Sequence, residues 1–63
     1  PQVYWLAKSF IVLGDSFVER GDLEQAKATF ESVRDGYEAQ SADDDVQDNV
    51  AMRLKKLNEM MAQ

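Results

Sequence analysis

The acidic side chains are the first residues of this sequence whose types and spacing would allow chemistry. Asp43, Asp44 and Asp45 are consecutive and Asp48 follows closely, a density of oxygen ligands of the kind that calcium prefers. The spacing lacks the Gly and the terminal Glu of an EF-hand loop. Carboxylates also stabilise the positive N-terminal end of a helix. We therefore assign this run to helix capping and predict no metal ion.

Other catalytic groups are scarce, because the chain contains no His and no Cys. This composition excludes Ser-His and Cys-His nucleophiles, an imidazole base, a disulfide and a His- or Cys-based zinc site. The remaining carboxylates do not fall in a segment that predicts a pocket, and so short a chain offers little concavity. The sequence therefore predicts a protein that is not an enzyme, with no catalytic residue and no cofactor.

Length and charge exclude further classes of protein. The chain has 63 residues and a net charge of −5, from 12 acidic and 7 basic residues. A chain of this size forms one small domain of marginal stability. Nucleic-acid modules carry a basic face, and none is present, so we expect no nucleic acid as partner. No run approaches the ~18 apolar residues of a membrane span, so we expect no direct membrane insertion. The cellular compartment stays open.

Helical periodicity positions these residues on three segments. The first, residues 3–20, is apolar over about half of its circumference, which is typical of a helix with neighbours on more than one side. Its main apolar face comprises Val3, Leu6, Ala7, Phe10, Leu13, Gly14 and Phe17, widened by Tyr4, Ile11 and Val18. Trp5 and Val12 lie inside the otherwise polar arc. Gly21-Asp22 predicts a tight turn in which Asp22 caps the next helix, so the second helix returns antiparallel.

The second and third segments, residues 22–37 and 44–61, have narrower stripes. The apolar residues of the second stripe are Leu23, Ala26, Phe30, Val33 and Tyr37. Those of the third are Val46, Val50, Leu54, Leu57 and Met61, with Gln47, Arg53, Lys56 and Glu59 on the opposite, solvent-facing side. Residues 38–44 read as a loop, in which Ser41 or Asp43 caps the third helix. A helix with one apolar face covers a surface and meets water on its other side.

The residues from Phe10 to Glu38 resemble the tetratricopeptide repeat. The resemblance is carried by Leu13-Gly14, Phe17, Gly21-Asp22, Ala26 and Phe30. It implies an all-α solenoid fragment, in which Gly14 faces Ala26 while Phe10, Leu13, Phe17 and Phe30 fill the space beside that contact. The single domain, residues 1–63, then comprises a helix pair (3–37), a loop (38–44) and a capping helix (45–63). The Pro that often follows the second helix of the family is absent. We interpret the chain as a C-terminal fragment of a bacterial array.

The resemblance also implies a groove that holds a peptide or a partner helix. Carried over by position, its candidate residues are Lys8, Ile11, Asp15, Val18 and Glu19. An alternative is that Ile11 and Val18 form the edge of the core and that Asp15 and Glu19 are ordinary solvated residues.

Three functions remain open. The first is a protein-interaction scaffold, the terminal repeat and cap of an array. The second is a purely structural cap, with partner binding elsewhere in the array. The third is a self-associating helical module: Tyr4, Trp5 and Val12 form an exposed seam on which a second copy packs in a two-fold homodimer.

Overall fold

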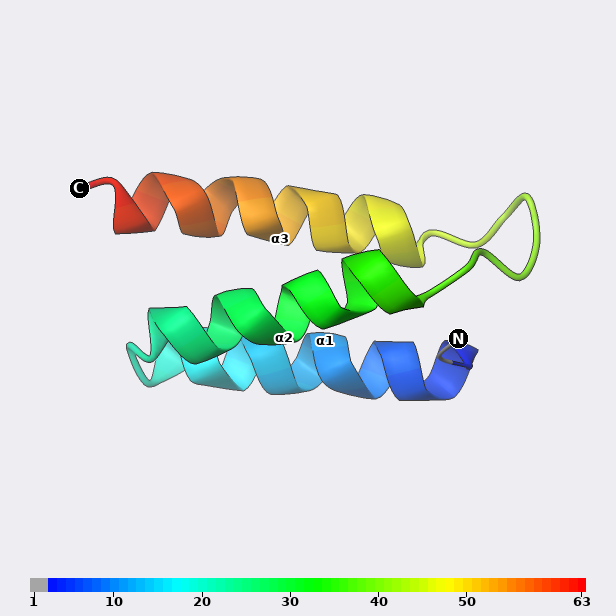
Figure 1. Ribbon diagram of the computed structural model, residues 1–63, viewed down its shortest axis with the longest axis horizontal. Coiled ribbons are helices and arrows are strands. Elements are labelled where there is room, and N and C mark those ends of the chain that lie inside the picture. The colour runs from blue at the N-terminus through cyan, green and yellow to red at the C-terminus, as the bar shows by residue number, and fades with distance from the viewer. Residues whose placement is uncertain (1–2) are drawn as a thin grey trace.

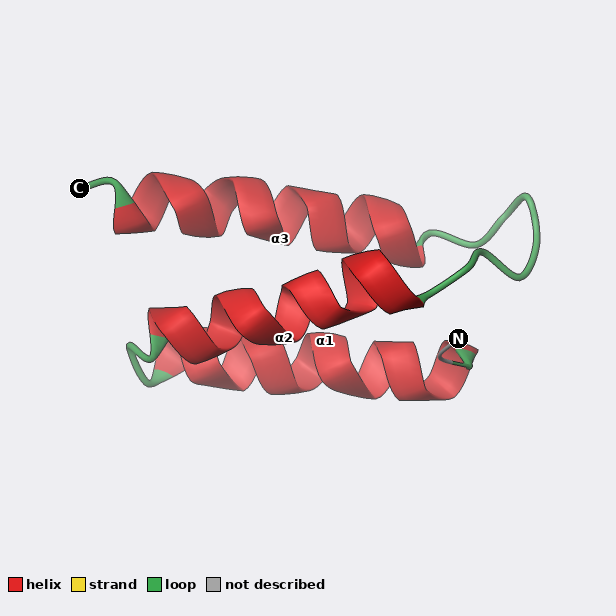
Figure 2. Cartoon of the chain, viewed as in Figure 1, coloured by secondary structure: helices red, strands yellow, loops and turns green. Residues whose placement is uncertain are grey.

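The computed structural model describes residues 3–63 and folds them into three α-helices (Figure 1). These are α1 (Tyr4–Glu19), α2 (Leu23–Gly36) and α3 (Val46–Met61). Within this range there is no strand, and loops make the two connections (Figure 2). The expected all-α fold is confirmed. Pro1 and Gln2, which the predicted domain includes, lie outside the described residues.

The helices run antiparallel to one another in chain order, and α2 lies between α1 and α3 (Figure 1). Both outer helices pack chiefly against α2 and touch each other less. The molecule is accordingly elongated, with extents of 36 × 17 × 15 Å. The predicted helix ranges agree with the observed ones to within two residues, which is the ordinary uncertainty of a helix end.

The turn between α1 and α2 has the predicted chemistry. Gly21 adopts a φ of +77°, a left-handed conformation that glycine reaches without the steric penalty of a side chain. The Asp22 backbone N–H donates to Phe17 O (2.9 Å). The Asp22 carboxylate then accepts from the Gln25 backbone N–H (3.3 Å), which caps α2. The short connection positions α2 directly alongside α1.

The core is the surface on which the stripes of α2 and α3 meet a narrow strip of α1. Its buried hydrophobic residues are Ala7, Ile11, Ala26, Phe30, Val33, Tyr37, Val46, Val50, Leu54 and Leu57. Among the described residues, no polar or charged side chain is buried. The stripes predicted for the second and third helices are therefore confirmed, with Leu23 and Met61 packed against their ends.

At Gly14, the backbone of α1 lies against the ring of Phe30 on α2. A Cβ atom added at Gly14 would lie 2.7 Å from Cζ and 2.8 Å from Cδ1 of Phe30, closer than van der Waals contact permits. Phe30 therefore lies flat against the bare backbone at Gly14. Ala26 is buried in the same core, but the ring is the group that requires the glycine.

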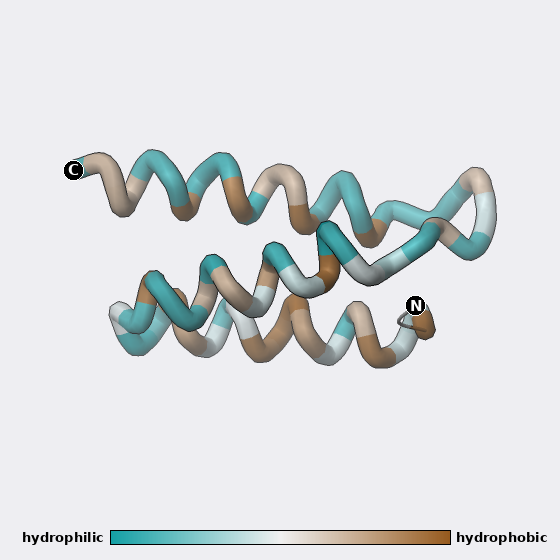
Figure 3. The backbone as a smooth tube through the Cα atoms, in the orientation of Figure 1, coloured by the Kyte–Doolittle hydropathy of each residue, from teal (hydrophilic) through white to brown (hydrophobic). Residues whose placement is uncertain are grey.

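The buried strip of α1 is also narrower than the sequence predicts. Leu6 and Leu13 are 45% and 41% exposed, whereas Ile11 is 6% exposed. The reason is that α1 has one main neighbour, so only the strip of Ala7, Ile11 and Gly14 is fully buried. Leu13 therefore does not fill the space beside the helix contact. Figure 3 shows the result: hydrophobic colour recurs along α1, while the outward side of α3 is mainly hydrophilic.

Replacing Phe30 by Ala should remove the centre of the core. Phe30 is 1% exposed, and truncation of a buried Phe costs ~3–5 kcal/mol. Since that is comparable with the whole stability of so small a domain, the variant should lose its cooperative thermal melt, followed by circular dichroism. A melting temperature within a few degrees of the parent would show that Phe30 is peripheral.

Replacing Gly14 by Ala tests the ring contact itself. In a helix interior, Gly to Ala usually stabilises by ~1 kcal/mol, but an overpacked core loses ~1–3 kcal/mol. We expect the overpacking to outweigh the gain in helix propensity, so the urea midpoint of Gly14→Ala should fall below that of the parent. Phe30→Leu removes the ring. In that background the effect of Gly14→Ala on the free energy of unfolding should change sign, so that the substitution stabilises the domain. Equal effects of Gly14→Ala in the two backgrounds would refute the contact.

Candidate binding cleft between the first and third helices

A cleft of about 270 Å³ opens between α1 and α3. Phe30 is the one residue of α2 that reaches it. The residues that line the cleft are Asp15, Val18, Phe30, Met52, Arg53, Lys56, Leu57 and Met60. It lies where α1 and α3, which both pack on α2, make few contacts with each other.

The cleft is mainly apolar. Val18, Phe30 and Leu57 belong to the core or pack against it, so they form a fixed surface. Met52 and Met60 are exposed and lie two helical turns apart on α3. Methionine has an unbranched, polarizable side chain that adapts to ligands of different shape. The cleft therefore combines a rigid part with two adjustable side chains.

An ion pair joins the two helices across the cleft. Arg53 Nε donates to Asp15 Oδ1 (2.9 Å) and Arg53 Nη2 donates to Asp15 Oδ2 (3.2 Å). Arg53 Nη1 also donates to the carbonyl oxygen (3.3 Å) and Oδ1 (3.2 Å) of Asn49. The bidentate geometry fixes the direction of both side chains. The pair is part-exposed, so it orients the cleft more than it stabilises the fold.

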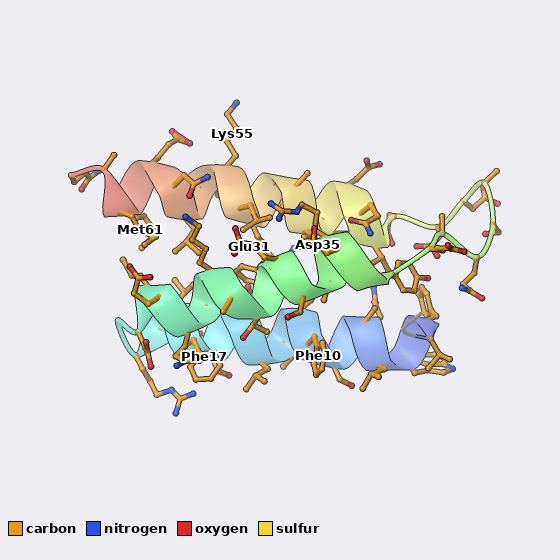
Figure 4. All side chains as sticks on the ribbon, in the orientation of Figure 1. Phe10, Phe17, Glu31, Asp35, Lys55 and Met61 are labelled. Atoms are coloured by element: carbon orange, nitrogen blue, oxygen red, sulfur yellow. The ribbon has the colours of Figure 1, made fainter. Side chains whose placement is uncertain are left out.

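The basic residues beside this pair differ in their surroundings. Lys55 projects from α3 away from α2 (Figure 4), whereas Lys56 lines the cleft. Within residues 3–63, Lys56 has no ion-pair partner. The cleft therefore presents one uncompensated positive charge next to its apolar surface.

The structure separates the five predicted groove residues. Asp15 and Val18 line the cleft. Ile11 is buried in the core and offers almost no surface. Glu19 is exposed outside the cleft lining, and the Lys8 ammonium lies over the Tyr4 ring, 5.5 Å from its centroid.

Sequence reasoning missed the contribution of α3 to the cleft. Arg53 was expected on the solvent side, yet it is half-buried and bound to Asp15. Met52, Lys56 and Met60 recur every four residues beside the buried stripe. That row was the available signal, because positions four apart share one side of a helix.

The three predicted seam residues lie on α1, away from the cleft lining. Trp5 is 75% exposed and Val12 is 65% exposed. Tyr4 is half-buried and packs against the core, while its ring meets that of Trp5 edge-on with centroids 5.2 Å apart. Tyr4 therefore belongs more to the fold than to the exposed seam.

Within the acidic run, Asp44 is the residue whose carboxylate makes hydrogen bonds to its surroundings. Its carboxylate accepts hydrogen bonds from the Gln40 backbone N–H (2.9 Å), the Val46 backbone N–H (2.9 Å) and the Tyr37 hydroxyl. The bond from Gln40, followed by that from Tyr37, lowers the pKa of Asp44. Burial, together with the bond to Asp44, raises the pKa of Tyr37 to about 12.

The cap of α3 therefore differs from the prediction of Ser41 or Asp43. Asp45 precedes the helix without a side-chain cap bond, and Asp44 supplies the acceptor instead. Gln47, expected on the solvent side, donates its side-chain amide to the carbonyl oxygens of Val33 (3.2 Å), Arg34 (3.2 Å) and Tyr37 (2.8 Å). These bonds fasten the start of α3 to the end of α2.

No group of three or more acidic, His or Cys side chains within residues 3–63 is arranged to hold a metal ion. No helix in the same range has the length and the apolar character needed to cross a membrane. Comparison of the chain with known protein families, curated proteins and solved structures found no match.

The Asp44 bonds predict a pH dependence. A carboxyl whose pKa is lower in the folded than in the unfolded state adds stability above its ordinary pKa of ~3.9. That contribution is lost as the pH falls from the unfolded pKa through the lower folded one. Asp44→Asn should therefore lower the urea midpoint at neutral pH and flatten its decline in acid. Asp43→Asn removes the same charge without these bonds and is the matched control. Identical profiles for the two variants would contradict the assignment.

Proposed function

We propose that this domain is a non-enzymatic protein-interaction module, the terminal unit of a tetratricopeptide array, which binds a partner in the cleft between α1 and α3. The observation that carries the proposal is the cleft itself. It places an apolar surface, two exposed methionines and the unpaired Lys56 next to one another. Apolar hollows with a few polar groups at the edge are typical of binding sites.

The size of the cleft favours a peptide side chain over a cofactor. Its volume of about 270 Å³ lies just below the ~300–1,000 Å³ of small-molecule sites. One large apolar side chain of a partner segment fits between Met52 and Met60. Lys56 favours an acidic residue next to that anchor, since opposite charges at the edge of an interface direct association. The ligand is thus a short segment that carries Leu, Met or Phe beside Asp or Glu.

The repeat assignment rests on residue types together with geometry. The antiparallel pair α1–α2, the small Gly14 under the Phe30 ring and the Gly21-Asp22 turn all accord with the Leu-Gly, Gly-Asp and Ala-Phe pattern.

A second candidate is that α3 acts only as a structural cap. The Gln47 bonds to the end of α2 and the burial of Leu54 and Leu57 favour it. On this alternative, α3 shields the core from water while partners bind other repeats. The two candidates differ in whether changes inside the cleft affect binding.

A peptide selection tests the proposal. Peptides displayed at random should be enriched on the domain when they carry an apolar anchor beside an acidic residue. Met60→Glu, which puts a negative charge at the mouth of the cleft, should weaken the binding of a selected peptide at least tenfold, measured by fluorescence anisotropy. Ala28→Glu, on an exposed position of α2, adds the same charge elsewhere and should leave binding unchanged.

The position of the bound peptide provides a second readout. Amide resonances around Val18, Met52 and Met60 should shift most on titration. If no peptide is enriched, or if Met60→Glu and Ala28→Glu bind a selected peptide equally, the cleft is not the site and the structural cap is favoured.

A further inference from the structure

The outer side of α1, which turns away from α2, carries most of the exposed large hydrophobic residues of the described chain. Seven large hydrophobic residues are exposed within residues 3–63, and five of them belong to α1 or to its N-cap. These five are Val3, Trp5, Leu6, Val12 and Leu13. The remaining two, Met52 and Met60, belong to the cleft. Exposed apolar patches of this kind mark interaction surfaces.

Around Ser9 this side of α1 carries no charge, although the chain as a whole has a net charge of −5; Arg20, the C-cap, continues the same side beyond the end of the helix. The charged residues of α1 are Lys8, Asp15 and Glu19. Successive residues of a helix are rotated by ~100°, which places all three on one narrow edge, next to the core strip. The acidic groups of two copies would therefore stay apart if their α1 helices met through the outer side.

The pattern of the outer side is symmetric about Ser9. Trp5 and Leu13 lie four residues before and after it, and Leu6 and Val12 lie three residues before and after it. Positions seven apart fall almost in line along a helix. Trp5 and Val12 therefore form one flank of Ser9, and Leu6 and Leu13 form the other.

We infer that a second copy of this chain covers the outer side, with the two α1 helices antiparallel about a two-fold axis beside Ser9. A two-fold interface requires a surface that complements itself. Antiparallel pairing places Trp5 against the partner's Val12 on one flank and Leu6 against the partner's Leu13 on the other. Each large residue before Ser9 then meets a large residue after it.

Ser9 suits the crossing point for two reasons. Its side chain is small, so the two helix backbones approach closely. Its hydroxyl donates to the carbonyl oxygen of Trp5 (3.0 Å), so burial leaves no unsatisfied donor. The interface is modest in area: an exposed aromatic contributes on the order of 150 Å², and stable interfaces start at about 1,200 Å² in total. We therefore expect dissociation in the micromolar range.

The dimer is independent of the proposed peptide site. Asp15 and Val18, which line the cleft, lie on the side of α1 that turns towards α2 and α3. Pairing through Ser9 leaves both clefts open. A failure of peptide binding therefore does not affect this inference, and a failure of dimerisation does not affect the cleft.

Charge reversal at the two-fold axis tests the inference. The parent chain should sediment as a dimer at concentrations above tens of micromolar, and the emission of Trp5, the one Trp of the chain, should shift to the blue as the dimer forms. Ser9→Glu and Ser9→Lys should each be monomeric with unchanged helix content, because like charges meet at the axis. An equimolar mixture of the two should recover a dimer, since opposite charges then meet. Ala28→Glu and Ala28→Lys are matched controls that stay dimeric.

A second pair of variants checks the register and replaces the first if a Ser9 variant loses helix content. Trp5→Lys and Val12→Glu should each be monomeric, and their mixture should form a heterodimer through the new Lys–Glu contact. A parent chain that sediments as a monomer at millimolar concentration overturns the inference and assigns the outer side to another partner. The inference is also overturned if the Ser9 variants remain dimeric. It is overturned as well if neither the mixed Ser9 variants nor the mixture of Trp5→Lys with Val12→Glu recovers a dimer.

Discussion

The contact between the Phe30 ring and the bare backbone at Gly14 is the constraint on which the rest of the structure depends. It joins α1 directly to α2, and any side chain at position 14 would overlap the ring. Because α2 lies between the other two helices, its position relative to α1 also sets where α3 packs. The same ring reaches the cleft between α1 and α3. One contact thus links the stability of the core to the shape of the candidate binding site.

The third helix is held by a different kind of interaction. The stripe of Val46, Val50, Leu54 and Leu57 provides apolar burial, which is strong but not directional. Direction comes from polar groups: Asp44 and Gln47 join the start of α3 to the end of α2, and Arg53 joins its middle to Asp15 on α1. Together these bonds fix the position of α3, so that Met52 and Met60 line the same cleft as Val18.

Local patterns in the sequence were sufficient to predict the helices and the turn, but not the contacts between the helices. The Gly21-Asp22 turn and the stripe through Ala26, Phe30 and Val33 depend on neighbours along the chain, and both were predicted correctly. Ile11 and Leu13 exchanged their expected roles, because α1 is apolar on so many sides that periodicity does not indicate which strip faces α2. Of the five groove candidates, Asp15 and Val18 line the cleft. Its other wall is formed by α3: the row of Met52, Lys56 and Met60 indicates one side of that helix, but the spacing does not show that this side faces α1.

The odd number of helices has a mechanical consequence. Because three antiparallel helices alternate in direction, the start of α1 and the end of α3 lie at opposite ends of the long axis (Figure 1). Tension applied between the two ends of the domain would act parallel to the helices and load their contacts in shear. The ring contact at Gly14, the stripes of the core and the Asp15–Arg53 pair would then resist together instead of opening one after another. Resistance to force is governed by the unfolding rate and not by the free energy of unfolding, so a modest thermodynamic stability does not by itself fix the mechanical strength of the domain.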